Sequence, residues 1–365
     1  MKIKIERESF IKALAVGSQM TGKAKGLSVL DNVKCTFKDG MATISSYDGE
    51  VAITKRTKIV EQDEECAVCL EPKTLGAILN SLKDEIVEFD FHDHKCEIVH
   101  SKGVLSVPYF DTDDYPSPII DAKKDSFELQ SVLLFNWLKE ARGFVSTNTL
   151  YPQLMCVCLY VDENEFGVAA TDASTLYHDK IEYDYHGEQQ QLTLSIKAIN
   201  ALLPMINGSE KVVIINSERN VMFRTNDSML VATKSELPFP NFKAIIPTNN
   251  HIEVELNKND FMEAIKRTMI TADEKTCLLK FTINGMMMEI DSENTLEGRK
   301  SHDECVCVSN GVDMSIAMNG NYVINMVNAI ESETMKLTLN SFNKPVLWID
   351  MLNNDKVLLQ MPCAI

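Results

Sequence analysis

The sequence lacks the features that mark a membrane protein or a nucleotide-binding enzyme. None of its apolar runs approaches the ~18 residues that a membrane-spanning helix needs. Its first residues carry charges where a signal peptide would need an apolar run. It contains no G-x-x-x-x-G-K-[ST] phosphate loop and no G-x-S-x-G nucleophile turn. We therefore expect a cytoplasmic protein with no membrane partner, no cofactor and no catalytic centre.

The ten cysteines do not follow a metal-binding or disulfide pattern. Cys156 and Cys158 are two residues apart in an apolar run, so they share one face of a predicted strand. Cys66 and Cys69 form a C-x-x-C pair, but no second such pair follows, and a structural zinc site needs four ligands. We interpret the cysteines as small apolar side chains of buried strands.

What the sequence does contain is an internal repeat with a period of 124 residues. The segments 73–82, 197–206 and 321–330 carry apolar residues at the same offsets, i, i+3, i+4 and i+7, which form one face of an amphipathic helix. A chain of 365 residues accommodates three such units, each large enough for its own core. We predict three similar domains, which span residues 1–122, 123–247 and 248–365.

Each third is expected to contain the order strand, helix and three strands twice. An alternating run that changes to helical spacing opens each third, and short alternating runs follow. Hairpin turns are predicted at matched positions, namely Lys38-Asp-Gly40, Asp162-Glu-Asn164 and Asn284-Gly285. Two helices and about eight strands per third indicate an α+β fold in which both helices lie on one face of the sheets.

Two polar clusters leave a metal-dependent enzyme open as an alternative. Asp111, Asp113 and Asp114 could bind a cation, but they lie in a proline-containing linker, where acidic residues are ordinarily solvated. His92 and His94 have metal-ligand chemistry, but they lie where a hairpin turn is expected. A protein-interaction scaffold with no DNA role is the main alternative, because it agrees with the net charge of −17.

Basic residues recur in or beside the predicted helices, although the net charge disfavours binding to nucleic acid. Net charge does not locate charges, and an acidic exterior is compatible with a basic inner surface. If all six helices line one concave surface, these residues could contact a DNA duplex without reading its bases. They are Lys12, Lys23, Lys25, Lys73, Lys139, Arg142, Lys197, Lys266 and Arg267.

The whole chain resembles the bacterial DNA polymerase III beta subunits, the beta sliding clamps. The resemblance rests on the repeat and on the order of four motifs, Val168-Ala-Ala-Thr-Asp172, Phe239-Pro-Asn-Phe-Lys-Ala-Ile-Ile-Pro247, Met318-Asn-Gly-Asn-Tyr-Val323 and Leu359-Gln-Met-Pro-Cys-Ala-Ile365. It implies a non-enzymatic processivity factor, a head-to-tail homodimer ring of six similar domains that closes around double-stranded DNA. It also implies three kinds of partner: the polymerase III alpha subunit, an ATP-driven clamp loader and other proteins with clamp-binding motifs.

The resemblance further implies an apolar pocket between the second and third domains that accepts a short partner peptide. The matching positions are Leu154, Thr171, Leu176, Pro240, Ile245, Pro345, Met361 and Pro362. The sequence departs from the family pattern at the rim, where Ala173-Ser174-Thr175 replaces Gly-His-Arg, and Ala244 and Ala364 replace basic residues. We hypothesise that partner peptides depend less on acidic contacts with this rim.

Ring closure should pair an edge strand of the first domain with an edge strand of the third domain. A closed dimer of this kind contains two identical interfaces. We expect the interface near Val104, Leu105 and Val107 on one side, and near Met269 and Ile270 on the other. A charged side chain in place of Ile270 is predicted to yield monomers.

Overall fold

The computed structural model describes residues 1–22, 28–310 and 313–364. In these ranges the order strand, helix and three strands occurs six times, as the sequence predicts. The helices are α1 (Arg7–Gly17), α2 (Pro72–Ser81), α3 (Ser131–Ala141), α4 (Ile196–Ile206), α5 (Lys258–Met269) and α6 (Gly320–Asn328). Short 3-10 segments are η1 (Ser28–Asp31), η2 (Arg142–Phe144), η3 (Pro152–Leu154) and η4 (Phe242–Ile245).

The chain forms two compact units, each with one 12-stranded antiparallel sheet. Unit 1 comprises residues 1–136 and 197–236, and unit 2 comprises residues 137–196 and 237–365. The middle third of the chain is therefore divided, because part of its strands extend the sheet of the first third and the others extend the sheet of the last third. The predicted three-domain division stays a prediction.

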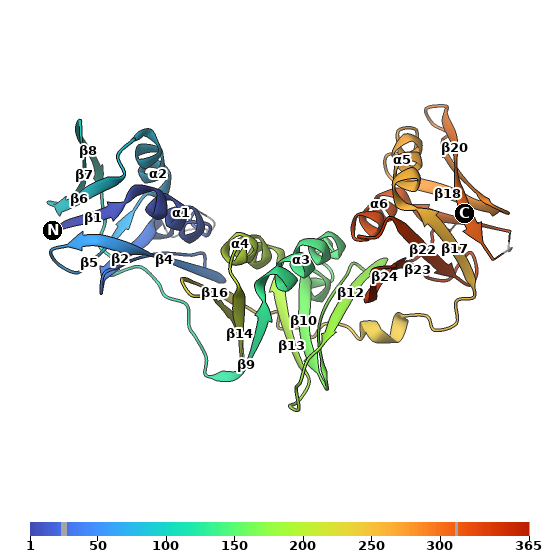
Figure 1. Ribbon diagram of the computed structural model, residues 1–365, viewed down its shortest axis with the longest axis horizontal. Helices are drawn as coiled ribbons and strands as arrows, with labels where there is room; N and C mark the ends of the chain where they lie inside the picture. Colours follow the sequence, from blue (N-terminus) through green and yellow to red (C-terminus); the bar gives the residue numbers. More distant parts are fainter. Residues whose placement is uncertain (23–27, 311–312, 365) are drawn as a thin grey trace. The chain divides into compact units, whose positions relative to one another are not determined.

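Unit 1 carries its helices α1 and α2 side by side on one face of its sheet (Figure 1). The order β8-β7-β6-β1-β4-β16-β15-β14-β9 forms the main path, and β3, β2 and β5 branch from β4. Phe10 of α1 meets Phe89 edge to face, with ring centroids 5.3 Å apart. The strands are β1 (Lys2–Glu6), β2 (Val33–Lys38), β3 (Met41–Tyr47), β4 (Val51–Gln62), β5 (Cys66–Leu70), β6 (Ile86–His92), β7 (Lys95–His100), β8 (Gly103–Pro108), β9 (Lys123–Gln130), β14 (Lys211–Ser217), β15 (Asn220–Arg224) and β16 (Ser228–Thr233).

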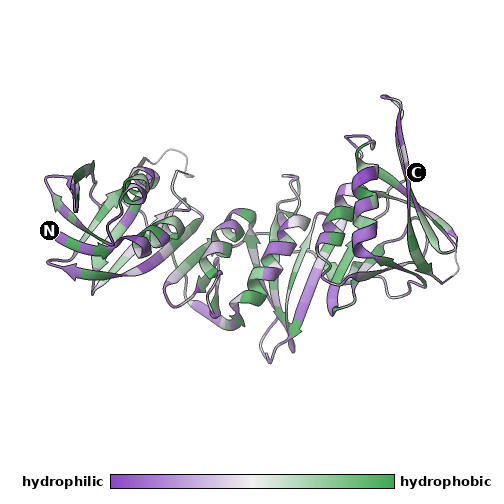
Figure 2. Cartoon of the chain, turned by 45° about the horizontal axis from the view of Figure 1, so that its top comes forward, coloured by the Kyte–Doolittle hydropathy of each residue, from purple (hydrophilic) through white to green (hydrophobic). Residues whose placement is uncertain are grey.

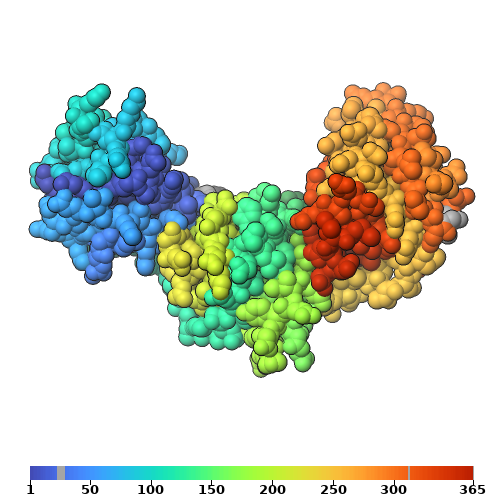
Figure 3. Space-filling model, viewed as in Figure 1, coloured from blue at the N-terminus to red at the C-terminus, as the bar shows by residue number. Residues whose placement is uncertain are grey.

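Unit 2 has the strand order β13-β10-β11-β12-β24-β23-β22-β17-β20-β19-β18-β21. The amphipathic helices α5 and α6 bury their apolar faces, which are green in Figure 2, and Phe261 packs 5.9 Å from Trp348. The C-terminal segment, red in Figure 3, lies against the green strands that include β12. The strands are β10 (Cys156–Asp162), β11 (Glu165–Thr171), β12 (Thr175–Glu182), β13 (Gln190–Ser195), β17 (Ile252–Asn257), β18 (Leu278–Asn284), β19 (Met287–Asn294), β20 (Arg299–Ser309), β21 (Met314–Asn319), β22 (Thr334–Leu339), β23 (Val346–Asp350) and β24 (Asn353–Gln360).

The predicted hairpin turns are present at all three matched positions. Gly40, Asn164 and Gly285 have φ angles of 71°, 59° and 61°, the left-handed conformation that tight hairpin turns require. The histidine cluster is also a turn, because His92 pairs with Lys95 across two residues of positive φ. None of the helices in the described ranges is long and apolar enough to cross a membrane.

Candidate functional site

The β12–β24 junction of unit 2 brings most of the predicted pocket residues together. β12 pairs with β11 on one side and with β24 on the other, and β24 pairs with β23. This register places Thr171, Leu176, Leu359 and Leu347 in one row across four strands. Directly paired residues of an antiparallel sheet lie on the same face, so the four side chains form a common surface, which we name the junction row.

The junction row lies on the face of the sheet opposite the helices. The neighbouring Tyr177 points the other way, where its hydroxyl donates a 3.0 Å hydrogen bond to Glu140 of α3. The linker between β16 and β17 covers part of the junction-row face, and its residues Phe239 and Phe242 share a core cluster with Leu176. The aromatic residues of the linker therefore pack against this face.

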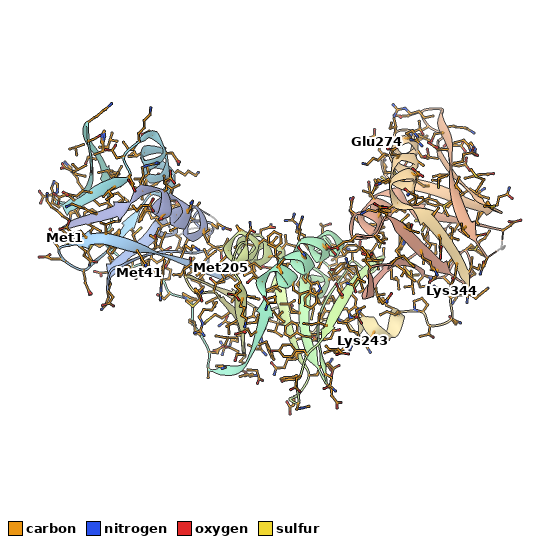
Figure 4. All side chains as sticks on the ribbon, in the orientation of Figure 1. Met1, Met41, Met205, Lys243, Glu274 and Lys344 are labelled. Carbon is orange, nitrogen blue, oxygen red and sulfur yellow. The ribbon has the colours of Figure 1, made fainter. Side chains whose placement is uncertain are left out.

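Two predicted pocket residues, Pro240 and Ile245, lie in the same linker and are exposed, Ile245 to 50%. Lys243 attaches the linker to the sheet: its Nζ lies 4.9 Å from the ring centroid of Tyr160 and 2.5 Å from a carboxylate oxygen of Glu165. Figure 4 shows Lys243 on η4, on the side of β12 away from α3. The linker thus holds Pro240 and Ile245 beside the junction row.

The turn between β11 and β12 is fixed by its own polar groups. Asp172 accepts hydrogen bonds from the backbone N–H groups of Ser174 and Thr175, at 2.9 and 2.7 Å. Thr171 donates its hydroxyl to the Thr175 carbonyl, which explains its burial. Ala173 has a φ of 75°, a left-handed conformation that favours glycine. The turn therefore holds an alanine in a conformation that glycine adopts without strain.

The C-terminal tail connects this turn to the last third of the chain. The N–H of Met361 donates to the Ser174 carbonyl at 2.8 Å, and the N–H of Cys363 donates to the Ala317 carbonyl at 2.8 Å. Met361 remains 38% exposed. Pro362, which lies between these two anchors, is half-buried. The tail thus presents Met361 and Pro362 at one end of the junction row.

Two predicted pocket residues are placed less directly. Pro345 is half-buried and directly precedes β23. Leu154 is 7% exposed at the end of η3, where its carbonyl accepts the N–H of Ser146 at 2.9 Å. It precedes by two residues Cys156, a member of the core cluster of Leu176.

The motif-based prediction omitted residues that the structure adds to this site. Tyr322 of α6 lies beside Asp172. Burial raises the pKa of the Tyr322 hydroxyl, and the nearby Asp172 carboxylate raises it further. This tyrosine is part of the motif 318–323, so a signal for it was available in the sequence. Leu347 lies in no such motif, and only the strand register places it in the junction row.

A buried histidine supports the linker beneath Phe242. His178 is 5% exposed, its Nε2 lies 2.7 Å from the Tyr160 hydroxyl oxygen, and its ring centroid is 5.1 Å from that of Phe242. Burial lowers its pKa to about 4. Burial acts to raise the pKa of Glu165, but hydrogen bonds from Lys180 and Lys243 bring it down to about 2. Near neutral pH, His178 is therefore neutral and Glu165 is fully ionised.

The predicted DNA-facing residues differ in whether carboxylates already engage them. Lys197 is half-buried and its Nζ lies 2.9 Å from Asp48 and 2.5 Å from Glu50. Arg267 forms a 2.6 Å ion pair with Asp303. The remaining described members are exposed and make no ion pair within residues 1–22, 28–310 and 313–364; they are Lys12, Lys73, Lys139, Arg142 and Lys266. Lys23 and Lys25 lie outside the described residues.

The predicted interface residues lie on a terminal strand and at a helix end. β8 is the last strand of the unit 1 sheet, and its Val104 and Leu105 are 54% and 36% exposed, whereas Val107 is buried. Ile270, directly after α5, is 75% exposed. Met269 is half-buried at the last position of that helix.

Comparison with known proteins identifies the family. The model of the DNA polymerase III beta subunit N-terminal domain matches residues 1–120, and that of the C-terminal domain matches residues 243–364. The chain belongs to the DNA polymerase III beta subunit family. The beta sliding clamp of Rickettsia bellii is 22% identical over 363 residues, and that of Staphylococcus epidermidis is 23% identical over 359 residues, each alignment covering 95% of both chains.

Solved beta subunit structures share the fold over the full length of the chain. A DnaN sliding clamp from Pseudomonas aeruginosa bound to griselimycin superposes with a TM-score of 0.95 at 18% identity, and covers 100% of both chains. The beta subunit of Thermotoga maritima superposes with a TM-score of 0.91 at 19% identity, covering 100% of this chain and 99% of that one. The α+β clamp fold predicted from the sequence is confirmed.

As a beta subunit, the protein is a DNA polymerase processivity factor and not an enzyme. The family forms dimers that encircle DNA, and it binds polymerase III and the clamp loader. The family assignment does not favour a scaffold without a DNA role.

Proposed function

We propose that the helices of this clamp present its DNA-facing surface. The six helices contain eight Lys or Arg residues and four Asp or Glu residues. The whole chain, in contrast, contains 36 basic and 53 acidic residues. Positive charge is thus concentrated in the helices of a strongly acidic protein, which supports sequence-independent contacts of Lys12, Lys73, Lys139, Arg142 and Lys266 with DNA phosphates.

A clamp-loading experiment tests this proposal. Protein loaded on nicked circular DNA should remain bound and should dissociate when the circle is cut, because retention is topological. In the variant K12A/K73A/K139A/K266A, loading should become several-fold weaker, and the matched variant K38A/K95A/K123A/K344A should load normally, because those exposed lysines lie outside the helices. Equal loading of both variants would contradict the helix-face proposal without contradicting the clamp function.

We infer that the junction row, the linker and the tail form the site for partner peptides. Ile245 and Met361 are exposed, and leucine or phenylalanine side chains of a peptide would bury apolar area against them. Methionine adapts to different apolar partners because it is unbranched. The rim residues Ala173, Ala244 and Ala364 carry no charge, which supports the hypothesis that acidic flanks contribute little.

Fluorescence anisotropy with short peptides that contain leucine and phenylalanine tests this site. I245A and M361A should each weaken binding about five- to thirtyfold, since truncation of an anchoring side chain in an interface costs ~1–2 kcal/mol. M286A, which also removes an exposed apolar side chain, serves as control. Much tighter binding of acid-flanked peptides than of neutral ones would rule out the rim hypothesis.

We propose that the ring closes by continuing an internal pairing pattern. β4, β12 and β20 begin at Val51, Thr175 and Arg299, one repeat apart. β4 pairs with β16 in unit 1, and β12 pairs with β24 in unit 2. By the same rule β20 should pair with β8 of a second copy. β8 is a terminal strand, and within the described ranges residues 299–306 of β20 pair only with β19.

The two internal junctions also suggest the register of this contact. Val51 pairs with Ala232, and Thr175 pairs with Gln360. The position on β8 that corresponds to Ala232 and Gln360 is Val107. Val107 pairs with Cys96, the second residue of β7, just as Ala232 pairs with Val221, the second residue of β15. Arg299 should therefore face Val107 of the partner, and Ser301 should face Leu105, close to the predicted interface residues Met269 and Ile270.

Mass measurement in solution tests the placement of this interface. The variant I270D should be monomeric, because burial of an unpaired carboxylate in the contact is unfavourable. L150D alters an apolar residue of similar exposure between η2 and η3, outside the predicted contact, and should remain dimeric. An unchanged dimer mass for I270D would contradict the placement.

The DNA partner supports a further proposal, that the protein is located in the cytoplasm, on the nucleoid.

A further inference from the structure

The β4–β16 junction of unit 1 carries two arginines around a small cavity that the clamp function does not use. The cavity has a volume of about 100 Å³ and is lined by Thr54 and Arg56 of β4, Arg224 at the end of β15, and Met229 and the turn before it. We propose that this cavity binds a carboxylate side chain from an acidic segment of a protein partner.

The strand register places both arginines on the sheet face opposite the helices. Thr54 pairs with Met229, and Met229 pairs with Arg224, so these three side chains form one row. Arg56 follows Thr54 by two residues and therefore lies on the same face. The alternate residues Ile53 and Leu230 are fully buried on the helix side. The two arginines thus flank the cavity from β4 and β15, the strands on either side of β16.

No carboxylate in the described part of the chain neutralises these arginines. Neither Arg56 nor Arg224 takes part in an ion pair there, and both are exposed. Asp227 also lines the cavity, but its Oδ2 lies 2.7 Å from Lys55 and its Oδ1 accepts the hydroxyl of Ser228. The carboxylate of Asp227 is therefore already engaged, and two positive charges remain for a ligand.

The lining chemistry fits a carboxylate. Guanidinium groups bind carboxylates through two parallel hydrogen bonds. Asn226 adds a further polar group to the lining, whereas the hydroxyls of Thr54 and Thr225 already bond to Ser45 and Asp227. The volume corresponds to roughly three water molecules, which admits a carboxylate group but not a nucleobase.

Two observations favour an acidic protein segment over a nucleic acid. Nucleic-acid binding requires a track of cations along the backbone and aromatic side chains for stacking. The lining contains two arginines and no aromatic residue. In a protein with a net charge of −17, such a local positive site provides selectivity for acidic segments, because the rest of the acidic surface repels them.

Titration of the full-length protein with a fluorescently labelled octaglutamate peptide tests the proposal. At low salt the wild type should bind octaglutamate and should not bind octaglutamine. R56A/R224A should weaken binding at least tenfold, and R56K/R224K should weaken it by a smaller factor, since lysine keeps the charge and loses the forked geometry. K95A/K123A, which removes the same charge from other exposed strand positions, should bind like wild type.

Several results would overturn the proposal. One is that the wild type binds octaglutamine as tightly as octaglutamate, and another is that R56A/R224A keeps the wild-type affinity for octaglutamate. A third is that K95A/K123A loses as much affinity as R56A/R224A. A fourth is that a single-stranded oligonucleotide binds more tightly than octaglutamate and requires both arginines. Circular dichroism of each variant establishes that the fold is intact. Loading on circular DNA should be normal in R56A/R224A, which separates this site from the clamp function.

Discussion

The two internal junctions have the same strand register but different surroundings. At the β4–β16 junction Tyr47, Ala52, Val231 and Met222 form the row that corresponds to Thr171, Leu176, Leu359 and Leu347 at the β12–β24 junction. Ala52 occupies the place of Leu176 and Tyr47 that of Thr171, so the two rows differ in side-chain size at both positions. No counterpart of the C-terminal tail follows the first row, because the chain continues from β16 into the linker.

The difference shows how one repeated contact can serve two purposes. The first junction mainly extends a sheet, whereas the second carries a large apolar row, an aromatic linker and an anchored tail. Each junction also has a lysine that contacts two carboxylates. Buried Lys356 lies 3.0 Å from Glu140 and 3.7 Å from Asp350 at the second junction, whereas half-buried Lys197 contacts Asp48 and Glu50 at the first. These features make the second junction the more specialised of the two.

The largest expected loss of stability follows from replacing the lysine at the second junction, and a lysine at the first junction provides the comparison. K356M should lower the free energy of unfolding by about 3–5 kcal/mol, because Glu140 and Asp350 lose a buried partner. K55M, at the first junction, should cost less than ~1 kcal/mol, because its partner Asp227 is 48% exposed. Urea denaturation of both variants measures the contrast, and equal losses would show that the junctions are stabilised alike.

Acid should act selectively on the second junction through His178. Its pKa is about 4 in the folded protein and about 6.5 in an unfolded chain, so the unfolded state binds the proton more readily between these values. The contribution of neutral His178 to the free energy of unfolding should therefore be complete above pH 6.5. This contribution should fall by about 3 kcal/mol as the pH approaches 4.

Comparison of H178Q with wild type isolates this contribution. The variant should lose less stability between pH 7 and pH 4.5 than wild type does, as followed by thermal denaturation. H186Q removes an exposed histidine and should behave like wild type. The same acid dependence in wild type and H178Q would exclude His178 as the cause.

The smallest predicted effect concerns the turn at the junction row. Ala173 adopts a φ of 75°, so A173G should relieve strain and raise the free energy of unfolding by about 0.5–1 kcal/mol after the greater entropy of glycine in the unfolded chain is subtracted. A244G, in η4, should give no gain. A decrease in the urea midpoint of A173G would contradict this reading of the turn.

The local features of the fold were predictable from the sequence. Helical apolar spacing and turn residues such as Asp39 and Gly40 depend on near neighbours, and the structure contains the corresponding elements. The motifs drew attention to Thr171, Leu176 and Met361, which the strand register and the tail bring together, and their role in peptide binding stays a prediction.

Long-range pairing was not predictable in the same way. The division of the middle third between two sheets depends on the β4–β16 and β12–β24 contacts, which no local pattern encodes. For the same reason the sequence did not reveal that Lys197 is engaged by Asp48, some 150 residues earlier in the chain. It also left β20 out of the predicted interface, because its unpaired edge exists only once the sheet is formed.

Disulfide trapping tests most directly the claim that the internal pairing rule continues between subunits. Paired residues of antiparallel strands have Cα atoms ~4.5–5.5 Å apart, within the range that a disulfide bridges. Oxidation of L105C/S301C should give a covalent dimer on non-reducing electrophoresis, whereas L105C, S301C and the out-of-register L105C/H302C should remain largely monomeric. Absence of the covalent dimer from L105C/S301C, or equal cross-linking of L105C/H302C, would contradict the proposed register.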